Sequence, residues 1–172
     1  MVSLATDLIE AYASVFVHCW SQYAVQQRDG SYWRVREPLT LPLLAAYHSP
    51  AAGLGQALYD DGMRTGIDPV YALAFFMHES SFGTTGEARK TLALGNERCL
   101  PDRPCVDLDR GGYAQMQSWA DGFAHWYTLI LTLYVKQWHR ITIEQIVPKY
   151  APGSDGNDEE GYIAAIEHAV ET

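Results

Sequence analysis

Apolar side chains recur at helical spacing along much of this chain. Residues 4–24 place their apolar positions close to one face, which predicts an amphipathic helix. Residues 31–37 alternate weakly and indicate a short extended piece. We expect residues 1–45 to form this N-terminal helix and a connector, both packed on the rest of the protein.

Two further helices are predicted by a capping residue followed directly by proline. Ser49-Pro50 indicates a helix that ends near Gly66, and Asp68-Pro69 indicates the next one. The second of these helices has no charged side chain in its eight residues from Val70 to Met77. A helix that is apolar on every side is a central, buried one.

The second half of the chain begins with residues 81–112, which are rich in glycine, proline and charge and show no clear period. They predict a long irregular region or a small hairpin lobe, and such a stretch within a compact domain is usually functional. Ser118 and Asp121 then form a capping box that opens a helix over residues 119–138.

Two shorter helices follow. Thr142 with Gln145 gives another capping box for a helix ending at Lys149, and Asn157 or Asp158 caps a last helix. The pattern as a whole predicts a mainly α protein whose central helix ends at a long loop.

Composition and charge narrow the class of protein. With 172 residues, of which 48% are hydrophobic, the chain suits one domain with a packed core. The 12 Lys+Arg and 21 Asp+Glu give a net charge of −9, and basic residues cluster only at Arg34/Arg36 and Arg89/Lys90. Nucleic-acid binding is therefore not expected, because it needs clustered positive charge.

The apolar runs are too short for a membrane span. The most apolar helical stretch, 126–135, falls short of the roughly 20 residues that cross a bilayer. The N-terminus has no early Lys or Arg, so we expect that any export signal is missing from this chain. We expect a soluble monomer and leave its localisation open.

The three cysteines leave at least one unpaired. Cys99 and Cys105 bracket a rigid polar loop, either as a disulfide or as two reduced thiols, while Cys19 lies in an apolar stretch typical of a buried thiol. The histidines show no ligand spacing, and a zinc site lacks its second Cys/His pair. We expect neither a metal nor another cofactor.

Glu79 is the candidate for catalysis. It closes the uncharged helix directly after His78. Desolvation and the negative end of the helix dipole both raise the pKa of a carboxyl placed there. A carboxyl that keeps its proton near neutral pH is suited to general acid catalysis. The alternative is a solvated glutamate at a helix terminus.

Four blocks of sequence resemble the glucosaminidase-type peptidoglycan hydrolases of the lysozyme-like superfamily. In order, they are GIDPVYALAFFMHESSFGTTG (66–86), LALGNERC (92–99), GGYAQMQSWADGFAHWY (111–127) and YAPGSDGN (150–157). The resemblance covers roughly residues 45–170. It implies a lysozyme-like fold over 46–172, with a cleft between a helical lobe and a small, partly β lobe, and it matches Glu79 to the family's catalytic acid.

The resemblance also implies roles for individual residues outside the acid. Asn96 matches a cleft asparagine, the alternative being a turn residue that stabilises its own loop. Tyr150 corresponds in place to the cleft tyrosine of lytic transglycosylases, the alternative being a core tyrosine. Phe82, Tyr113, Trp119 and Tyr150 are candidates to offer ring faces to sugars.

One position departs from the family pattern. Where glucosaminidases usually carry a tyrosine before the next helix, this chain has Met116. A thioether cannot stabilise developing charge as a phenol can. Met116-Gln117 instead resembles the pair found in transglycosylases and goose-type lysozymes.

A second carboxylate, if the reaction uses one, is expected in the 81–112 region. Inversion needs a base about 6.5–9.5 Å from the acid, and retention needs a nucleophile at about 5–5.5 Å. We rank Glu97 and Asp109 first, ahead of Glu87, Asp102 and Asp107. In a third mechanism the N-acetyl group of the substrate is the nucleophile.

The expected function is hydrolysis of peptidoglycan glycan strands as an endo-β-N-acetylglucosaminidase, with Glu79 as general acid. The nearest alternative is a lytic transglycosylase or muramidase acting on the same polymer. A different class, a catalytically inactive wall-binding domain, is suggested by Met116 and by the open identity of the second carboxylate.

Overall fold

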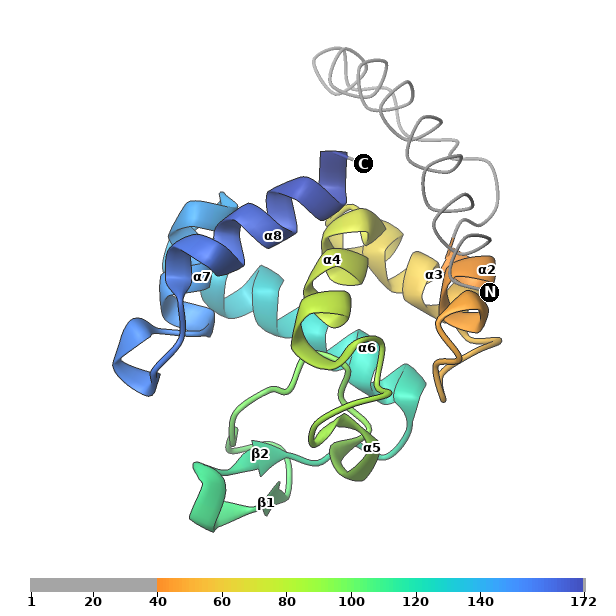
Figure 1. Cartoon of the computed structure of the whole chain (residues 1–172), viewed down its shortest axis with the longest axis horizontal. Coiled ribbons are helices and arrows are strands. Elements are labelled where there is room, and N and C mark those ends of the chain that lie inside the picture. The colour runs from red at the N-terminus through yellow and green to blue at the C-terminus, as the bar shows by residue number, and fades with distance from the viewer. Residues whose placement is uncertain (1–39, 172) are drawn as a thin grey trace.

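The computed structural model describes residues 40–171, and within them the protein is mainly helical with one small sheet (Figure 1). The α-helices are α2 (Thr40–Ala46), α3 (Gly55–Thr65), α4 (Pro69–Ser80), α5 (Ala88–Thr91), α6 (Trp119–Leu129), α7 (Ile143–Tyr150) and α8 (Glu159–Glu171). The strands are β1 (Cys105–Val106) and β2 (Tyr113–Ala114), and 3₁₀ turns cover Leu108–Arg110 and Gly153–Asp155. The helix expected at 4–24 and the extended piece at 31–37 lie outside the described residues.

Helix α4 lies at the centre of the helical part, between α3 and α8 (Figure 1). Asp68 caps it by accepting a hydrogen bond from the Val70 amide at 3.0 Å. Six of the apolar side chains from its first three turns are buried, and Phe76 packs against Phe123 and Trp126 of α6. The prediction of a central, buried helix is confirmed.

The expected start of α3 is wrong. Ser49 uses its hydroxyl to accept from the Ala51 amide at 3.1 Å and to donate to the Phe82 carbonyl at 2.7 Å, so it forms a turn tied to a distant loop. The helix begins only at Gly55 and ends, as predicted, at Gly66. Residues 40–46, expected as connector, form α2, whose Leu44 is fully buried in the same core.

Two of the three later helices follow their capping signals. The exception is α7, where the Thr142 side chain makes no capping bond, the Gln145 side chain accepts from the Ile141 amide, and the helix ends at Tyr150. The Ser118 hydroxyl accepts from the Asp121 amide at 3.1 Å, as the capping box predicts. Helix α6 then continues as a π-helix over Ile130–Gln137, so the helical stretch has nearly the expected length. At α8 the capping contact comes from Asp158, which accepts from the Gly161 amide at 3.0 Å.

Residues 81–112 fold into a small lobe at one end of α4 and α6, which confirms the hairpin expectation (Figure 1). Strands β1 and β2 pair antiparallel, with Cys105 opposite Ala114. Cys99 and Cys105 form a disulfide, one of the two alternatives left open by the sequence. Within residues 40–171, no helix has both the length and the apolar character to cross a membrane.

Candidate active site

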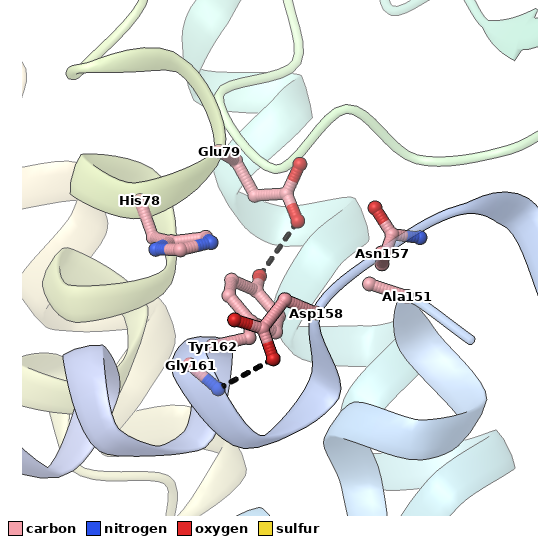
Figure 2. A pocket seen from close by; sticks show the side chains of 7 residues that line it. All are labelled: His78, Glu79, Ala151, Asn157, Asp158, Gly161 and Tyr162. Carbon is pink, nitrogen blue, oxygen red and sulfur yellow. Dashed lines mark hydrogen bonds between the residues drawn. The ribbon is translucent and has the colours of Figure 1, made fainter. Parts of the chain in front are cut away.

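A pocket of about 500 Å³ opens where the end of α4 faces the first turns of α8. Figure 2 shows Glu79 pointing from α4 toward Tyr162, with Asn157 and Asp158 at the start of α8. The lining residues are His78, Glu79, Ala151, Asn157, Asp158, Gly161 and Tyr162. The pocket thus includes the helix-end carboxyl that the sequence singled out.

Glu79 is half-buried and is held by two neutral donors. Its Oε1 accepts from the Tyr162 hydroxyl at 2.6 Å, and its Oε2 accepts from the Asn96 amide nitrogen at 3.3 Å. Burial raises the pKa of Glu79, against the smaller opposing effects of these two bonds and of Arg98. The carboxyl is therefore oriented and biased toward its protonated form, as a general acid requires.

The break after α4 fixes where this carboxyl points. Ser81 and Phe82 adopt left-handed backbone conformations, with φ of 46° and 55°, which end the helix directly after Ser80. The Ser80 hydroxyl donates to the Leu94 carbonyl at 2.8 Å. This bond ties the last turn of α4, which carries Glu79, to the segment 94–97.

Each residue of this 94–97 segment is anchored. Asn96, with φ of 47°, donates through its side chain to the Glu79 carbonyl at 2.7 Å as well as to its carboxylate. Gly95 lies so close to α6 that an added Cβ would stand 2.6 Å from both Trp126 and the Tyr150 hydroxyl, so only glycine fits. The expected cleft role of Asn96 is thus accompanied by direct contact with the candidate acid.

Glu97, ranked as a second carboxylate, lies outside the described lining of the pocket. It is 2% exposed, and its Oε2 lies 2.5 Å from Nδ1 of His125 on α6. The other ring nitrogen of His125 contacts Asp102 at 3.2 Å, and Arg103 pairs with Asp102 and Asp121. In this polar cluster Glu97 and His125 are buried while Asp102 is exposed, and the contacts fasten the small lobe to α6. Glu97 thus lies in this cluster and not among the described lining residues of the pocket, and its expected catalytic role stays a prediction.

Burial raises the pKa of Glu97, against its hydrogen bond with His125, and the same bond raises the pKa of His125. Both shifts favour keeping a proton within the pair. Asp109, the other ranked carboxylate, is exposed on the 3₁₀ turn Leu108–Arg110 of the small lobe, also outside the described pocket lining.

The aromatic candidates are occupied by packing. Phe82 is 1% exposed and meets Tyr47 at a ring distance of 4.9 Å, so it has no free face for a sugar. The Tyr150 hydroxyl donates to the Gly95 carbonyl at 2.5 Å and accepts from the Trp126 indole at 3.1 Å, which is the core alternative. Tyr113 lies on β2 beneath the guanidinium of Arg98, 4.9 Å from the ring centre. Neither these three residues nor Trp119 are among the described lining residues of the pocket.

Met116 is buried at 3% exposure in a small cluster with Ala93 and Ala114. It supports the small lobe from within and does not face the described pocket lining. Its thioether therefore takes part in packing.

The sequence did not predict that residues of α8 and of the segment before it line the pocket. Tyr162 donates to Glu79, and its ring centre lies 3.8 Å from that of His78, whose pKa is lowered by burial. The only sequence signal was the place of Tyr162 and Ile166 one turn apart on the apolar side of the last helix. That signal predicts burial but not contact with Glu79.

Among the described residues, no group of three or more His, Cys, Asp or Glu side chains is arranged to hold a metal ion. A scan against protein-family models finds no match, and searches of curated proteins and of solved structures find none either.

Proposed function

We propose that the chain is an endo-β-N-acetylglucosaminidase that hydrolyses peptidoglycan, with a lysozyme-like fold and with Glu79 as general acid. The observation that carries the proposal is the placement of Glu79, a desolvated carboxyl at the end of a buried helix, bonded to Tyr162 and Asn96 at the wall of a pocket. The four ordered sequence blocks supply the substrate class.

The hydrogen bonds indicate how Glu79 would present its proton. Burial and the nearby Glu79 charge raise the pKa of Tyr162, so its hydroxyl stays a donor. Because this hydroxyl donates to Oε1 at 2.6 Å, while the Asn96 bond to Oε2 is longer at 3.3 Å, Oε1 acts as the carbonyl oxygen of the acid and the proton belongs on Oε2. Glu79 then gives this proton to the glycosidic oxygen as the bond to the sugar C1 breaks, and water is the final acceptor.

The nearest alternative reaction is that of a lytic transglycosylase or muramidase, favoured by the Met116-Gln117 pair. It uses the same acid and polymer but a different bond or acceptor. An inactive wall-binding domain is the alternative from another class.

Mass spectrometry of digested peptidoglycan separates these functions. We expect products with reducing-end GlcNAc, and a loss of at least about 100-fold in rate for Glu79→Gln, the effect typical of removing a general acid. Glu167→Gln, an exposed position on α8, is the matched control. Anhydro-muramic or reducing muramic ends would contradict the proposal. Binding of glycan without cleavage by the parent protein would favour the wall-binding domain.

A further inference from the structure

The pocket contains a second carboxylate that sequence reasoning did not rank. Among its described lining residues, Asp158 carries the carboxyl group besides that of Glu79 (Figure 2). Glu97 is buried against His125, and Asp109 is exposed on the small lobe. The carboxylate that shares the pocket with the acid therefore comes from α8 and not from the 81–112 region.

Helix α8 holds the Asp158 carboxylate in place. Its Oδ1 accepts from the Gly161 amide at 3.0 Å, which caps the helix. A Cβ at Gly161 would stand 2.4 Å from Oδ2, so a larger residue there would displace the carboxylate from this position. Glycine inside a helix costs about 1 kcal/mol relative to alanine. Among the described contacts this cap uses only Oδ1, so Oδ2 remains available to a ligand in the pocket.

Tyr162 is bonded both to the backbone of Asp158 and to the Glu79 carboxylate. Its amide donates to the Asp158 carbonyl at 2.9 Å, while its hydroxyl donates to Glu79 at 2.6 Å. Side chains on a helix lean toward its N-terminus, over the turn that precedes them. The Tyr162 side chain points toward Glu79, to which its hydroxyl donates (Figure 2). A whole tyrosine side chain therefore spans the distance from the backbone turn of Asp158 to the acid.

The geometry points to Asp158 as the general base that activates water opposite Glu79, an inference that rests on the proposed function. Both carboxyl groups line one pocket, and the Tyr162 side chain extends from the turn that Asp158 caps to Glu79. In the inverting class of glycosidases the second carboxylate is such a base, placed to leave room for the attacking water. Asp158 Oδ2 takes a proton from water as its oxygen bonds to C1. The electrons of the C1–O bond pass to the leaving oxygen, which takes the Glu79 proton. Exchange with solvent then returns a proton from Asp158 to Glu79.

Asp158→Asn is the informative variant, because asparagine caps a helix as well as aspartate does and lacks the negative charge. Glu160→Gln, an exposed position on the same turn, is the matched control for loss of charge. We expect Asp158→Asn to lower kcat at least about 100-fold, the effect of a lost general base. We expect the control to keep the parent rate, and both variants to unfold thermally with the parent protein.

A second measurement does not depend on any variant. Proton NMR of the first product released by the parent protein reports the configuration at C1, and inversion of a β-linkage predicts the α-anomer. The β-anomer as first product, or a rate for Asp158→Asn within threefold of the parent, would overturn the role of Asp158. If the parent hydrolyses peptidoglycan and Glu79→Gln does not, such a result leaves the proposed function intact. Failure of the parent to hydrolyse would contradict the function itself.

Discussion

Glu79 and Glu97 are both glutamates next to the same loop, and burial is the largest influence on the pKa of each. Their partners differ. Glu79 accepts from a phenol and an amide at a pocket wall, whereas Glu97 pairs with an imidazole in the interior. A neutral partner leaves a desolvated carboxyl with a proton to give to a ligand, while a basic partner retains the proton within a closed pair. The comparison shows that the neighbour, more than burial, determines what a buried carboxyl does.

The two sites are linked through the 94–97 segment, since Asn96 bonds to Glu79 and the next residue bonds to His125. The interior pair thus fixes a segment that orients the candidate acid. The same substitution at both glutamates separates the chemical role from the structural one.

The largest expected difference is in activity. Glu79→Gln should lower the rate of glycan cleavage by about 10²–10⁴-fold, because it removes the proton donor. Glu97→Gln should cost less than about tenfold, or about 1.4 kcal/mol of barrier, since it acts only through Asn96. Initial rates of reducing-end release, measured where both variants are folded, test this. Equal losses would contradict the division of roles.

Stability should respond in the opposite order. Glu97→Gln replaces a buried charge-assisted hydrogen bond and should lower the free energy of unfolding by about 1–3 kcal/mol. Glu79→Gln should leave it nearly unchanged, because glutamine is neutral like the protonated carboxyl and its side-chain oxygen can still accept from Tyr162. Urea unfolding of the two variants and the parent decides, and a more stable Glu97→Gln would show that the interior pair is not stabilising.

The interior pair should also make stability depend on pH. The folded-state pKa of His125 is raised by Glu97, so its contribution is fully present below the ordinary histidine value of about 6.5 and is lost as pH rises through the folded value. One such proton changes the free energy of unfolding by at most about 1.4 kcal/mol per pH unit. Urea midpoints between pH 6 and 9 should fall in the parent and less so in His125→Gln. Parallel curves would show that another group is responsible.

Tyr162→Phe should have the smallest effect on the rate, several-fold, as expected for loss of about 1 kcal/mol from one hydrogen bond. It should shift the pH profile more clearly. The Tyr162 bond lowers the pKa of Glu79 below what burial alone produces, so its loss raises that pKa. A general acid works while protonated, and the alkaline limb of kcat/KM should therefore move to higher pH. An alkaline limb that stays in place or moves to lower pH would show that Tyr162 does not influence the pKa of Glu79.

Local signals predicted the helical frame, and long-range contacts escaped prediction. Asp68-Pro69 defined α4 because its cap involves only the next turn. Ser49-Pro50 carried the same signal, but the Ser49 hydroxyl bonds to a carbonyl 33 residues away. The partners of the two glutamates are equally remote, since His125 lies 28 residues from Glu97 and Tyr162 lies 83 residues from Glu79.

The candidate acid was predictable because a charge at the end of an uncharged helix is visible in the sequence. Its second carboxylate was not, since Asp158 reads as an ordinary helix cap and only the packing of α8 on α4 brings it to the pocket. The packing of Phe82 and Tyr150 escaped prediction for a related reason, because a sequence shows that these residues have rings but not which faces other groups cover.

The most direct test of this account is a titration of the Glu79 carboxyl carbon by NMR, with the resonance assigned by its loss in Glu79→Gln. We expect a midpoint above the ordinary glutamate value of about 4.3, because burial outweighs the bonds from Tyr162 and Asn96. A midpoint at or below that value would mean that Glu79 is ionised at neutral pH, and it would contradict the role of Glu79 as the proton donor.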